Sequence, residues 1–511
     1  MESSFSIPIS RRDFMKLAGI TAAGVIAGGS GGHSAEAAAP KTPGVDFGEA
    51  ELPVLLETDV CVAGGGSAGA AAAVSAARSG AKTVLVERGI MLGGLQTMGC
   101  VYPCMPTYID GSDTPYIQEL NRRMEKHGFS PDPGIVTKTF YGGGRSVYVP
   151  ETLSLVYDEM CSDAGVSILY DTALVGVVTE DGKITECVVQ TVEGLGKIRA
   201  KTFIDATGDA LLSRFANVPA EKGSSKTGRN QPMSLRFEMT GVDVNKVFKF
   251  FSETLKDGRM DPEFVKKFKY DHAHGRQPYL EFAKIKQNEA FFKKGVASGE
   301  LTEDDILYIQ GFSILGKPGT LALNCPEMPP LEYSSTSAVS RSQSVSFGRR
   351  MMHRLAVFFV KNIPGFEKAF ISREATMIGV RESWRIRGKY YLEEEDYWQA
   401  HHFPDAVCRT AYPIDIHDVK LDFVKKLEKG QYYEIPYRAM ITNEISNLIV
   451  AGRCISGSFA AQASFRIQPT CMSMGEAAGI AAAWGLSHDV EANAIRWEDI
   501  PKEDRSYSSE G

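Results

Sequence analysis

Residues 58–88 read TDVCVAGGGSAGAAAAVSAARSGAKTVLVER, and this stretch decides the fold. It predicts a buried strand over 59–63, a glycine turn, an alanine-rich helix and a second strand. Gly64 permits the sharp turn, Gly66 permits the backbone to approach a pyrophosphate, and Gly69 lets the helix pack close to the sheet. The free N–H groups and the positive dipole end of this helix favour phosphates.

The second strand, over 82–86, ends in Glu87, where a carboxylate can accept hydrogen bonds from the hydroxyl groups of a ribose. A lone GxGxxG often marks only a tight turn, but here the strands, the helix and the terminal acid agree. The stretch therefore predicts a site for an adenine dinucleotide, without choosing between FAD and NAD. A structural glycine turn in another α/β domain is the alternative.

The composition is that of an ordinary globular protein: 511 residues, 43% hydrophobic and 23% charged. The length predicts two or three domains of about 150 residues each. A net charge of −7 argues against nucleic acid or an anionic membrane surface as the main partner. The nine cysteines show neither a C-x-x-C pair nor zinc-like spacing, so we expect no metal site. Cys100 and Cys104 either pair after export or stay as buried thiols.

The N-terminal segment resembles a twin-arginine export signal. Residues 10–16, SRRDFMK, precede a mild apolar stretch over 17–32 and a small-residue cleavage site at 35–37. We expect 1–37 to be a signal peptide read by the twin-arginine translocase, and the mature protein to be periplasmic or otherwise exported. A chance Arg-Arg pair in a tail is the alternative. No later run of 18 or more apolar residues exists, so no stable membrane span is expected.

Further motifs extend the dinucleotide pattern. The turn at Asp181-Gly182 between alternating apolar residues predicts a hairpin. An apolar strand over 203–209 then ends in Ala-Thr-Gly-Asp. Residues 242–311, rich in Lys, Phe, Asp and Glu, predict amphipathic helices of an inserted cap. No second nucleotide fingerprint is found, because Gly142–Gly144 lacks the third glycine and reads as a turn.

Three separated blocks resemble the FAD-dependent oxidoreductases that are related to the fumarate reductase and glucose-inhibited-division flavoproteins. They are GGGSAG at 64–69 with Glu87, FIDATGD at 203–209, and LIVAGRCISGS at 448–458 with PTCMSMGEAAGIAAA at 469–483. IGVRESWRI at 378–386 and YPIDIH at 412–417 also match. The resemblance covers nearly the whole mature chain and implies FAD as the cofactor.

The resemblance implies roles by position. The first glycines and Glu87 would hold pyrophosphate and ribose, Asp209 would lie near the ribityl chain, and the helix after Thr470 would point at the flavin ring. A reduced flavin carries negative charge at its N1/O2 edge, which a helix N-terminus stabilises. The residues implied for FAD are Gly64, Gly65, Gly66, Ser67, Ala68, Gly69, Glu87, Arg88, Gly93, Gly94, Leu95, Thr97, Gly208, Asp209, Gly452, Arg453, Gln462, Thr470 and Met472.

The fold implied is α/β: a Rossmann-type FAD-binding domain, with a parallel sheet and a β-hairpin layer, and an inserted, mainly helical cap or substrate domain. The expected order is 1–37 signal peptide, 38–51 linker, 52–220 and 437–490 FAD-binding domain, 221–436 cap and 491–511 tail.

The candidate catalytic residues are Arg466, Arg385 and Arg381, whose guanidinium groups can clamp a carboxylate. For Arg381 and Arg385, a salt-bridge network with Glu382 and Glu374 is an equal alternative. The loop that often reads His-Glu-Ala-His in the related group reads Phe-Ala-Ala-Gln over 459–462 here, so both histidines are replaced. The pair His401 and His402 favours a surface position.

The sequence predicts an exported FAD-dependent oxidoreductase that transfers a hydride between flavin N5 and a small polar or anionic substrate. Because there is no second nucleotide fingerprint, we expect electrons to pass to or from a separate partner, a cytochrome or a quinone-linked protein, rather than NAD(P)H. A dehydrogenase of sugars or other hydroxyl substrates and a non-catalytic flavin-binding protein are the alternatives.

Overall fold

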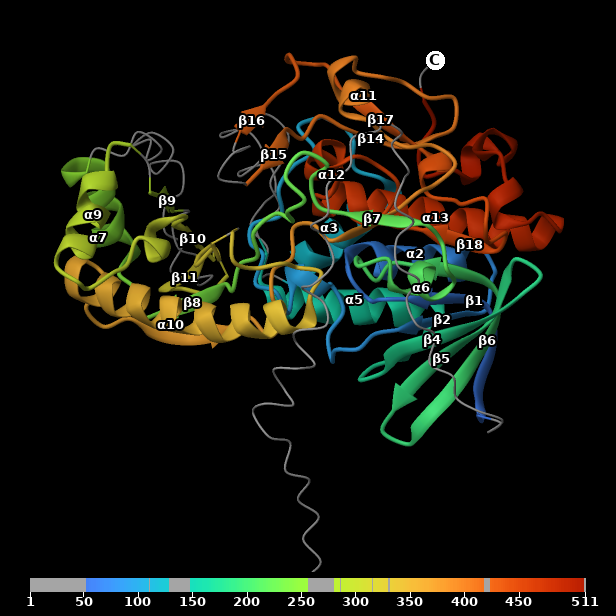
Figure 1. Ribbon diagram of the computed structural model, residues 1–511, viewed down its shortest axis with the longest axis horizontal. Helices are drawn as coiled ribbons and strands as arrows, with labels where there is room; N and C mark the ends of the chain where they lie inside the picture. The colour runs from blue at the N-terminus through green and yellow to red at the C-terminus, as the bar shows by residue number, and fades with distance from the viewer. Residues whose placement is uncertain are drawn as a thin grey trace, which may run out of the picture. The chain divides into compact units, whose positions relative to one another are not determined.

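The computed structural model describes residues 52–109, 111–127, 148–255, 280–284, 286–314, 316–329, 331–417 and 423–509 (Figure 1). All described residues belong to one compact unit. The predicted signal peptide, the linker over 38–51 and the Gly142–Gly144 turn lie outside the described residues.

The first sheet carries the dinucleotide motif at its centre. Its strands run in the order β3-β2-β1-β6-β5-β4, and β18 pairs with the C-terminal end of β6. Neighbours among β3, β2, β1, β6 and β18 are parallel, whereas β4 and β5 are antiparallel. The bounds are β1 Val54–Ala63, β2 Thr83–Val86, β3 Ser167–Leu169, β4 Ala173–Glu180, β5 Lys183–Thr191, β6 Gly194–Asp205 and β18 Leu448–Val450.

The predicted Rossmann-type core and its hairpin are confirmed in this sheet. β1 to β2 follow the order read from 58–88, with the helix α2 (Ser67–Arg78) between them. The hairpin turn between β4 and β5 has positive φ at both Asp181 (47°) and Gly182 (73°), as a two-residue turn that follows the strand twist requires.

Helix α13 (Gln468–His488) packs directly on α2 (Figure 1). A Cβ placed at Gly475 would lie 2.0 Å from the Ala68 carbonyl oxygen, and one at Gly479 would lie 2.2 Å from that of Ala72. Only glycine fits at such separations, so the two helix backbones touch. Helices α3 (Pro115–Lys126) and α5 (Pro150–Ala164) complete this layer.

A second sheet builds a separate hydrophobic core. Its order is β12-β8-β11-β10-β9, and every pair is antiparallel. The bounds are β8 Phe237–Thr240, β9 Glu281–Ala283, β10 Gln310–Ser313, β11 Thr320–Leu323 and β12 Phe370–Glu374, with helices α7 Val244–Lys249, α9 Glu289–Ala297 and α10 Ala338–Asn362. The core spans Leu235 to Ala375 and includes Cys100.

The helices expected for the cap are present, and they pack with this five-stranded sheet, which the sequence did not predict. These strands are only three to five residues long, and β10 and β11 are almost wholly buried. Strands that are buried on both faces lack the apolar–polar alternation by which a sequence reveals them.

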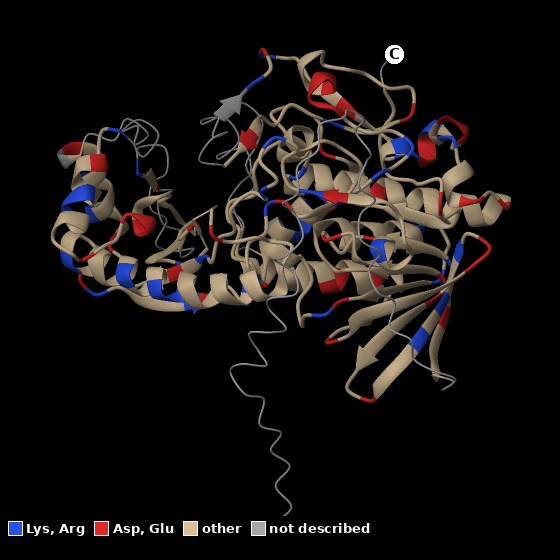
Figure 2. Cartoon of the chain, in the orientation of Figure 1, with Lys and Arg blue, Asp and Glu red and all other residues tan. Residues whose placement is uncertain are grey.

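The other described elements complete the chain. They are α6 Leu211–Phe215, β7 Ala220–Lys222, β13 Trp384–Ile386, α11 Glu394–Trp398, β14 Ala406–Thr410, β15 Ile414–Ile416, β16 Phe423–Lys425, β17 Tyr433–Pro436, α12 Phe459–Phe465, the π-helical turn η2 Phe250–Thr254, and the short 3-10 turns η1 Gly94–Gln96, η4 Asp304–Ile306, η5 Tyr437–Ala439, η6 Ala492–Ala494, η7 Trp497–Asp499 and η8 Lys502–Asp504. Buried apolar residues of β13, β14, β15 and β17 belong to the hydrophobic core that surrounds the first sheet. Helix α11 carries acidic residues and no basic ones, whereas α10 carries several Lys and Arg residues and no acidic ones (Figure 2). Among the described helices, none has the length and apolarity to cross a membrane.

Candidate functional site

The glycine turn after β1 has space where a pyrophosphate is expected. Gly64 has φ +95°, and a Cβ there would lie 2.7 Å from the Ala206 oxygen. A Cβ at Gly69 would lie 1.7 Å from the Gly64 oxygen, so helix α2 requires glycine at that position. A Cβ at Gly66, by contrast, would meet no atom within 4 Å. Open space in front of a helix N-terminus fits a phosphate group.

Glu87 is fixed at the end of β2 by the same turn. Its buried carboxylate accepts hydrogen bonds from the Gly65 N–H and the Gly89 N–H, each at 2.7 Å. The Gly93 N–H donates to the Gly65 oxygen at 2.8 Å, so the loop after β2 lies against the turn. This arrangement holds a carboxylate beside the open position at Gly66.

Other predicted FAD residues lie in the same region but hold protein partners. Ser67 Oγ donates to Gln96 Oε1 at 2.8 Å, and the Tyr157 hydroxyl donates to the same oxygen at 2.6 Å. Thr97 is fully buried, and its Oγ1 donates to the Leu92 oxygen at 2.5 Å. Gln96, which sequence reasoning missed, is therefore the link between α2, η1 and α5.

The remaining positions of this set are placed as follows. Arg88 is exposed, Leu95 is partly exposed, and Ala68 and Met472 are buried. Gly93 and Gly94 have positive φ (93° and 53°), and a Cβ at Gly94 would lie 3.2 Å from Gly66 Cα. Gly452 also has positive φ (91°), and a Cβ there would lie 3.2 Å from the Ala68 Cβ.

Asp209 lies at the centre of a charged cluster. Its carboxylate accepts from Arg453 Nη2 and Arg341 Nη2, both at 2.9 Å, and from Ser383 Oγ at 2.7 Å. Burial alone would raise the pKa of Asp209, but the guanidinium groups of Arg453 and Arg341 hold it well below its usual range. Arg453 Nε also donates to the Gly208 oxygen at 2.7 Å. Arg341 lies in the first turn of helix α10, so this cluster ties the second core to the segment that follows β6.

At the junction of α12 and α13, two buried atoms have no hydrogen-bond partner among the residues that the structure describes. Gln462 Nε2 donates to the Arg381 oxygen at 2.9 Å, while Gln462 Oε1 has no hydrogen-bond partner among the described residues. Thr470 Oγ1, in the first turn of α13, is likewise buried and unpartnered within the described chain. Buried polar atoms are normally hydrogen-bonded, so both indicate a group that the protein binds here.

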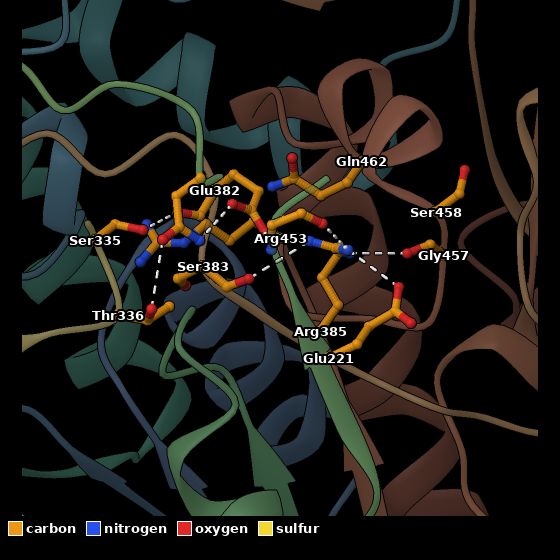
Figure 3. A network of polar contacts seen from close by, with 12 residues as sticks. Glu221, Ser335, Thr336, Glu382, Ser383, Arg385, Arg453, Gly457, Ser458 and Gln462 are labelled. Carbon is orange, nitrogen blue, oxygen red and sulfur yellow. Dashed lines mark hydrogen bonds and ion pairs between the residues drawn. The ribbon is translucent and has the colours of Figure 1, made fainter. Parts of the chain in front are cut away.

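Arg385 is fully occupied by the protein (Figure 3). Its guanidinium group pairs with Glu382, with Glu221 at 3.0 Å, and with the Gly457 oxygen at 2.8 Å through Nε. Two further carbonyl oxygens, of Ser383 and Gly223, accept its other hydrogens. The structure thus places Arg385 in the network with Glu382, while Glu374 pairs with Arg349 instead.

Arg381 and Arg466 lie in a second group of charged side chains, together with His417. Arg381 Nη2 is 2.8 Å from Glu327 Oε2, and His417 Nδ1 is 3.3 Å from the same oxygen. His417 Nε2 is 3.3 Å from Asp415 Oδ1, and Arg466 Nη2 is 3.2 Å from Asp415 Oδ2. The strand β15 thereby joins the second core to the α12–α13 junction.

The protonation states of these side chains follow from the charges of their neighbours. Burial opposes a charge on His417, but Glu327 and Asp415 raise its pKa to about 9. Burial likewise opposes ionised carboxylates, yet the basic groups hold the pKa of Glu327 and of Asp415 below their usual values. At neutral pH all these groups are charged, so Arg381, His417 and Arg466 exceed the two carboxylates by one positive charge.

Arg236 adds a further positive charge that sequence reasoning missed. It precedes β8, and Arg381 is close enough to lower its pKa: burial and that neighbour together lower it to about 10. Its Nε is buried without an acceptor in the described structure, as is Nε of Arg466. The sequence does contain a signal for a strand that carries Arg236, because Leu235, Phe237 and Met239 alternate with polar residues.

The other candidates from sequence lie elsewhere. His401 and His402 are 42% and 44% exposed and pair with Asp396 and Glu434 at the surface. Cys100 and Cys104 are buried free thiols, and burial raises the pKa of Cys100 to about 11. Over the described residues, no group of three His, Cys, Asp or Glu side chains is arranged to hold a metal ion.

The chain matches a known protein family and is similar to several solved structures. A family model described as FAD dependent oxidoreductase matches residues 59–503. Among solved structures, the chain is similar to a geranylgeranyl bacteriochlorophyll reductase-like protein from Thermoplasma acidophilum, with 13% identity, a TM-score of 0.43 and coverage of 88% of this chain and 85% of that chain. It is also similar to the flavin-dependent brominase Bmp2, with 12% identity, a TM-score of 0.45 and coverage of 86% of this chain and 81% of that chain. A third similar structure is the p-nitrophenol 4-monooxygenase PnpA from Pseudomonas putida DLL-E4, with 12% identity, a TM-score of 0.41 and coverage of 89% of this chain and 84% of that chain.

Proposed function

The chain belongs to the family of FAD-dependent oxidoreductases, and from this premise we propose that it is an exported enzyme acting on a small anionic substrate. FAD, when bound, supplies the two-electron chemistry at flavin N5. The residues that fit it are the Gly64–Gly69 turn, Glu87, Gln462 in α12 and Thr470 in the first turn of α13. Gln462 Oε1 and Thr470 Oγ1 are buried without a partner in the described structure.

The observation that carries the anionic substrate is the excess of positive charge beside the α12–α13 junction. Arg381, Arg466 and protonated His417 face only Glu327 and Asp415, and Arg236 has no carboxylate partner among the described residues. Uncompensated buried charge is unfavourable, so a bound anion stabilises this arrangement. Arg466 and Arg381 would position the substrate, and His417 would hold the two carboxylates in register.

Export and electron transfer to a separate partner belong to the same proposal. They are supported by the SRRDFMK motif at 10–16 and by a sequence that contains only one dinucleotide fingerprint. An enzyme loaded with FAD in the cytoplasm and then exported would not depend on NAD(P)H.

The test is anaerobic photoreduction of the purified, FAD-loaded protein. We expect small unsaturated carboxylates to reoxidise the photoreduced flavin, or small hydroxylated carboxylates to reduce the oxidised flavin. We expect no reduction of the oxidised flavin by NADH or NADPH. Neutral amides and keto-sugars form the comparison set. Failure of the protein to take up FAD would overturn the enzyme proposal, and reaction with only neutral sugars would favour the hydroxyl-substrate alternative.

A further inference from the structure

The segment that leads into β8 alternates strictly between two environments. Leu235, Phe237 and Met239 are buried in the second core, with exposed fractions of 2% or less. Successive side chains of an extended strand point to opposite faces, so Ser234, Arg236 and Glu238 share the other face. That face is the one from which Ser234 meets Arg381.

The three polar side chains on this face differ in their partners. Ser234 Oγ accepts from Arg381 Nη1 at 2.8 Å. Glu238 pairs with Lys317 at 2.9 Å and with Arg373 at 3.5 Å. The side chain of Arg236 has no hydrogen bond and no ion pair within the described ranges, and its Nε is buried. The guanidinium group of the partly exposed Arg236 thus has no counterion within the described ranges, whereas Ser234 has a hydrogen-bond partner and Glu238 has two ion pairs.

One further arginine and two tyrosines lie near Arg236. Arg381, Tyr308 and Tyr148 are close enough to act on it electrostatically. On the same segment, Gln231 Oε1 accepts from the His417 N–H at 3.4 Å, while Gln231 Nε2 is buried without an acceptor in the described structure. Gln231 and Arg236 therefore offer donors near Arg381 and His417. Within the described ranges, Arg236 Nε and Gln231 Nε2 have no acceptor.

An oxyanion is the ligand that such donors select. A planar guanidinium binds carboxylate, sulfate or phosphate through two parallel hydrogen bonds, and an amide N–H adds a further donor. Arg236 is partly exposed and its Nε is buried. A partly buried positive charge without a counterion is unfavourable, whereas a bound oxyanion removes that penalty.

We propose that Arg236 and Gln231 form an oxyanion subsite on the side of the second core, which receives an acidic group of the substrate. The subsite rests on the proposed function and deepens it, because it makes Arg236 a specificity-determining residue for the anionic substrate class. Arg466, at the α12–α13 junction, would then contact the part of the substrate nearer the flavin.

The experiment uses the full-length, FAD-loaded protein and its melting temperature in sodium sulfate or sodium acetate, at constant ionic strength set with sodium chloride. The variants are Arg236→Met and Arg236→Lys. The matched control is Arg349→Met, which removes an exposed arginine of α10 that pairs with Glu374. The two salts distinguish a tetrahedral oxyanion from a planar carboxylate.

We expect a saturable rise in the melting temperature of the wild type with one or both anions, retained by Arg349→Met. Arg236→Met should bind the anion about tenfold more weakly or worse, and should melt without anion at or above the wild-type temperature, since it removes an uncompensated charge. Arg236→Lys should keep part of the response. Three results would each overturn the subsite. They are an anion affinity of Arg236→Met equal to that of the wild type, no saturable response in the wild type, and strong destabilisation of both Arg236 variants without anion.

The outcomes also separate the subsite from the proposed function. Anion binding that depends on Arg236, in a protein that neither takes up FAD nor turns over, would leave the subsite standing and remove the enzyme proposal. If FAD uptake and turnover are insensitive to Arg236→Met, the enzyme proposal stands and the subsite is removed.

Discussion

Two arginine clusters are built around Arg381 and Arg385, the two ends of the segment 381–385, and they use their hydrogen bonds in opposite ways. Around Arg385 every donor of the guanidinium group meets a carboxylate or a carbonyl oxygen (Figure 3). Around Arg381, the neighbouring Arg236 and Arg466 each keep a buried Nε without an acceptor in the described structure. The saturated cluster holds the fold, whereas the unsaturated one has capacity left for a ligand.

The largest expected effect is on the saturated side. Arg385→Met leaves the fully buried Glu382 without its ion pair, and breaking a buried pair in this way destabilises a protein by about 3–5 kcal/mol. The measurement is the free energy of unfolding in urea. Arg349→Met, which removes an exposed pair, is the control and should change stability by less than about 1 kcal/mol. Equal, small effects of both substitutions would erase the contrast between the clusters.

On the unsaturated side the signature is a pH dependence. Because the pKa of His417 is raised from 6.5 to about 9, its stabilising charge is fully present below pH 6.5 and is lost as the pH rises through 9. We expect the wild type to lose about 2–3 kcal/mol over this interval. The slope should be absent in His417→Gln and retained in His402→Gln, which alters an exposed histidine. A wild-type slope that persists in His417→Gln would assign it to another group.

The same contrast between filled and open space occurs in the glycine turn. A side chain at Gly69 would overlap the Gly64 oxygen, so Gly69→Ala should destabilise the protein by about 1–3 kcal/mol. At Gly66 a methyl group meets nothing within 4 Å, so Gly66→Ala should fold as the wild type does and bind FAD more weakly. Unfolding in urea and the FAD content after dialysis distinguish the two. Unchanged FAD retention in Gly66→Ala would remove this turn from the cofactor site.

The sequence allowed the dinucleotide core to be predicted because its signals are local. The 58–88 stretch contains strand, turn, helix and terminal acid in one run, and the Asp181-Gly182 turn is specified by two adjacent residues. The sheet of the second core could not be predicted in the same way, since its short buried strands pair across long separations.

The candidate site could be predicted only in part, because its residues also come together across long sequence separations. Arg381 and Arg466 could be selected by motif, but Glu327 and His417 come from segments far apart along the chain, and nothing in one sequence pairs them. The same holds for the state of each arginine. Arg381 and Arg385 are four residues apart and chemically identical, and only the packed structure shows that the second has no donor left.

The most direct test of an anion site next to the flavin is the absorbance spectrum of the FAD-loaded wild-type protein during titration with acrylate and with its neutral isostere acrylamide. The excess positive charge of the side chains beside the start of α13 predicts a saturable change of the flavin spectrum with acrylate. It predicts no change with acrylamide at the same concentrations. A response of equal affinity to the neutral amide, or no response to any carboxylate of this size, would contradict that site.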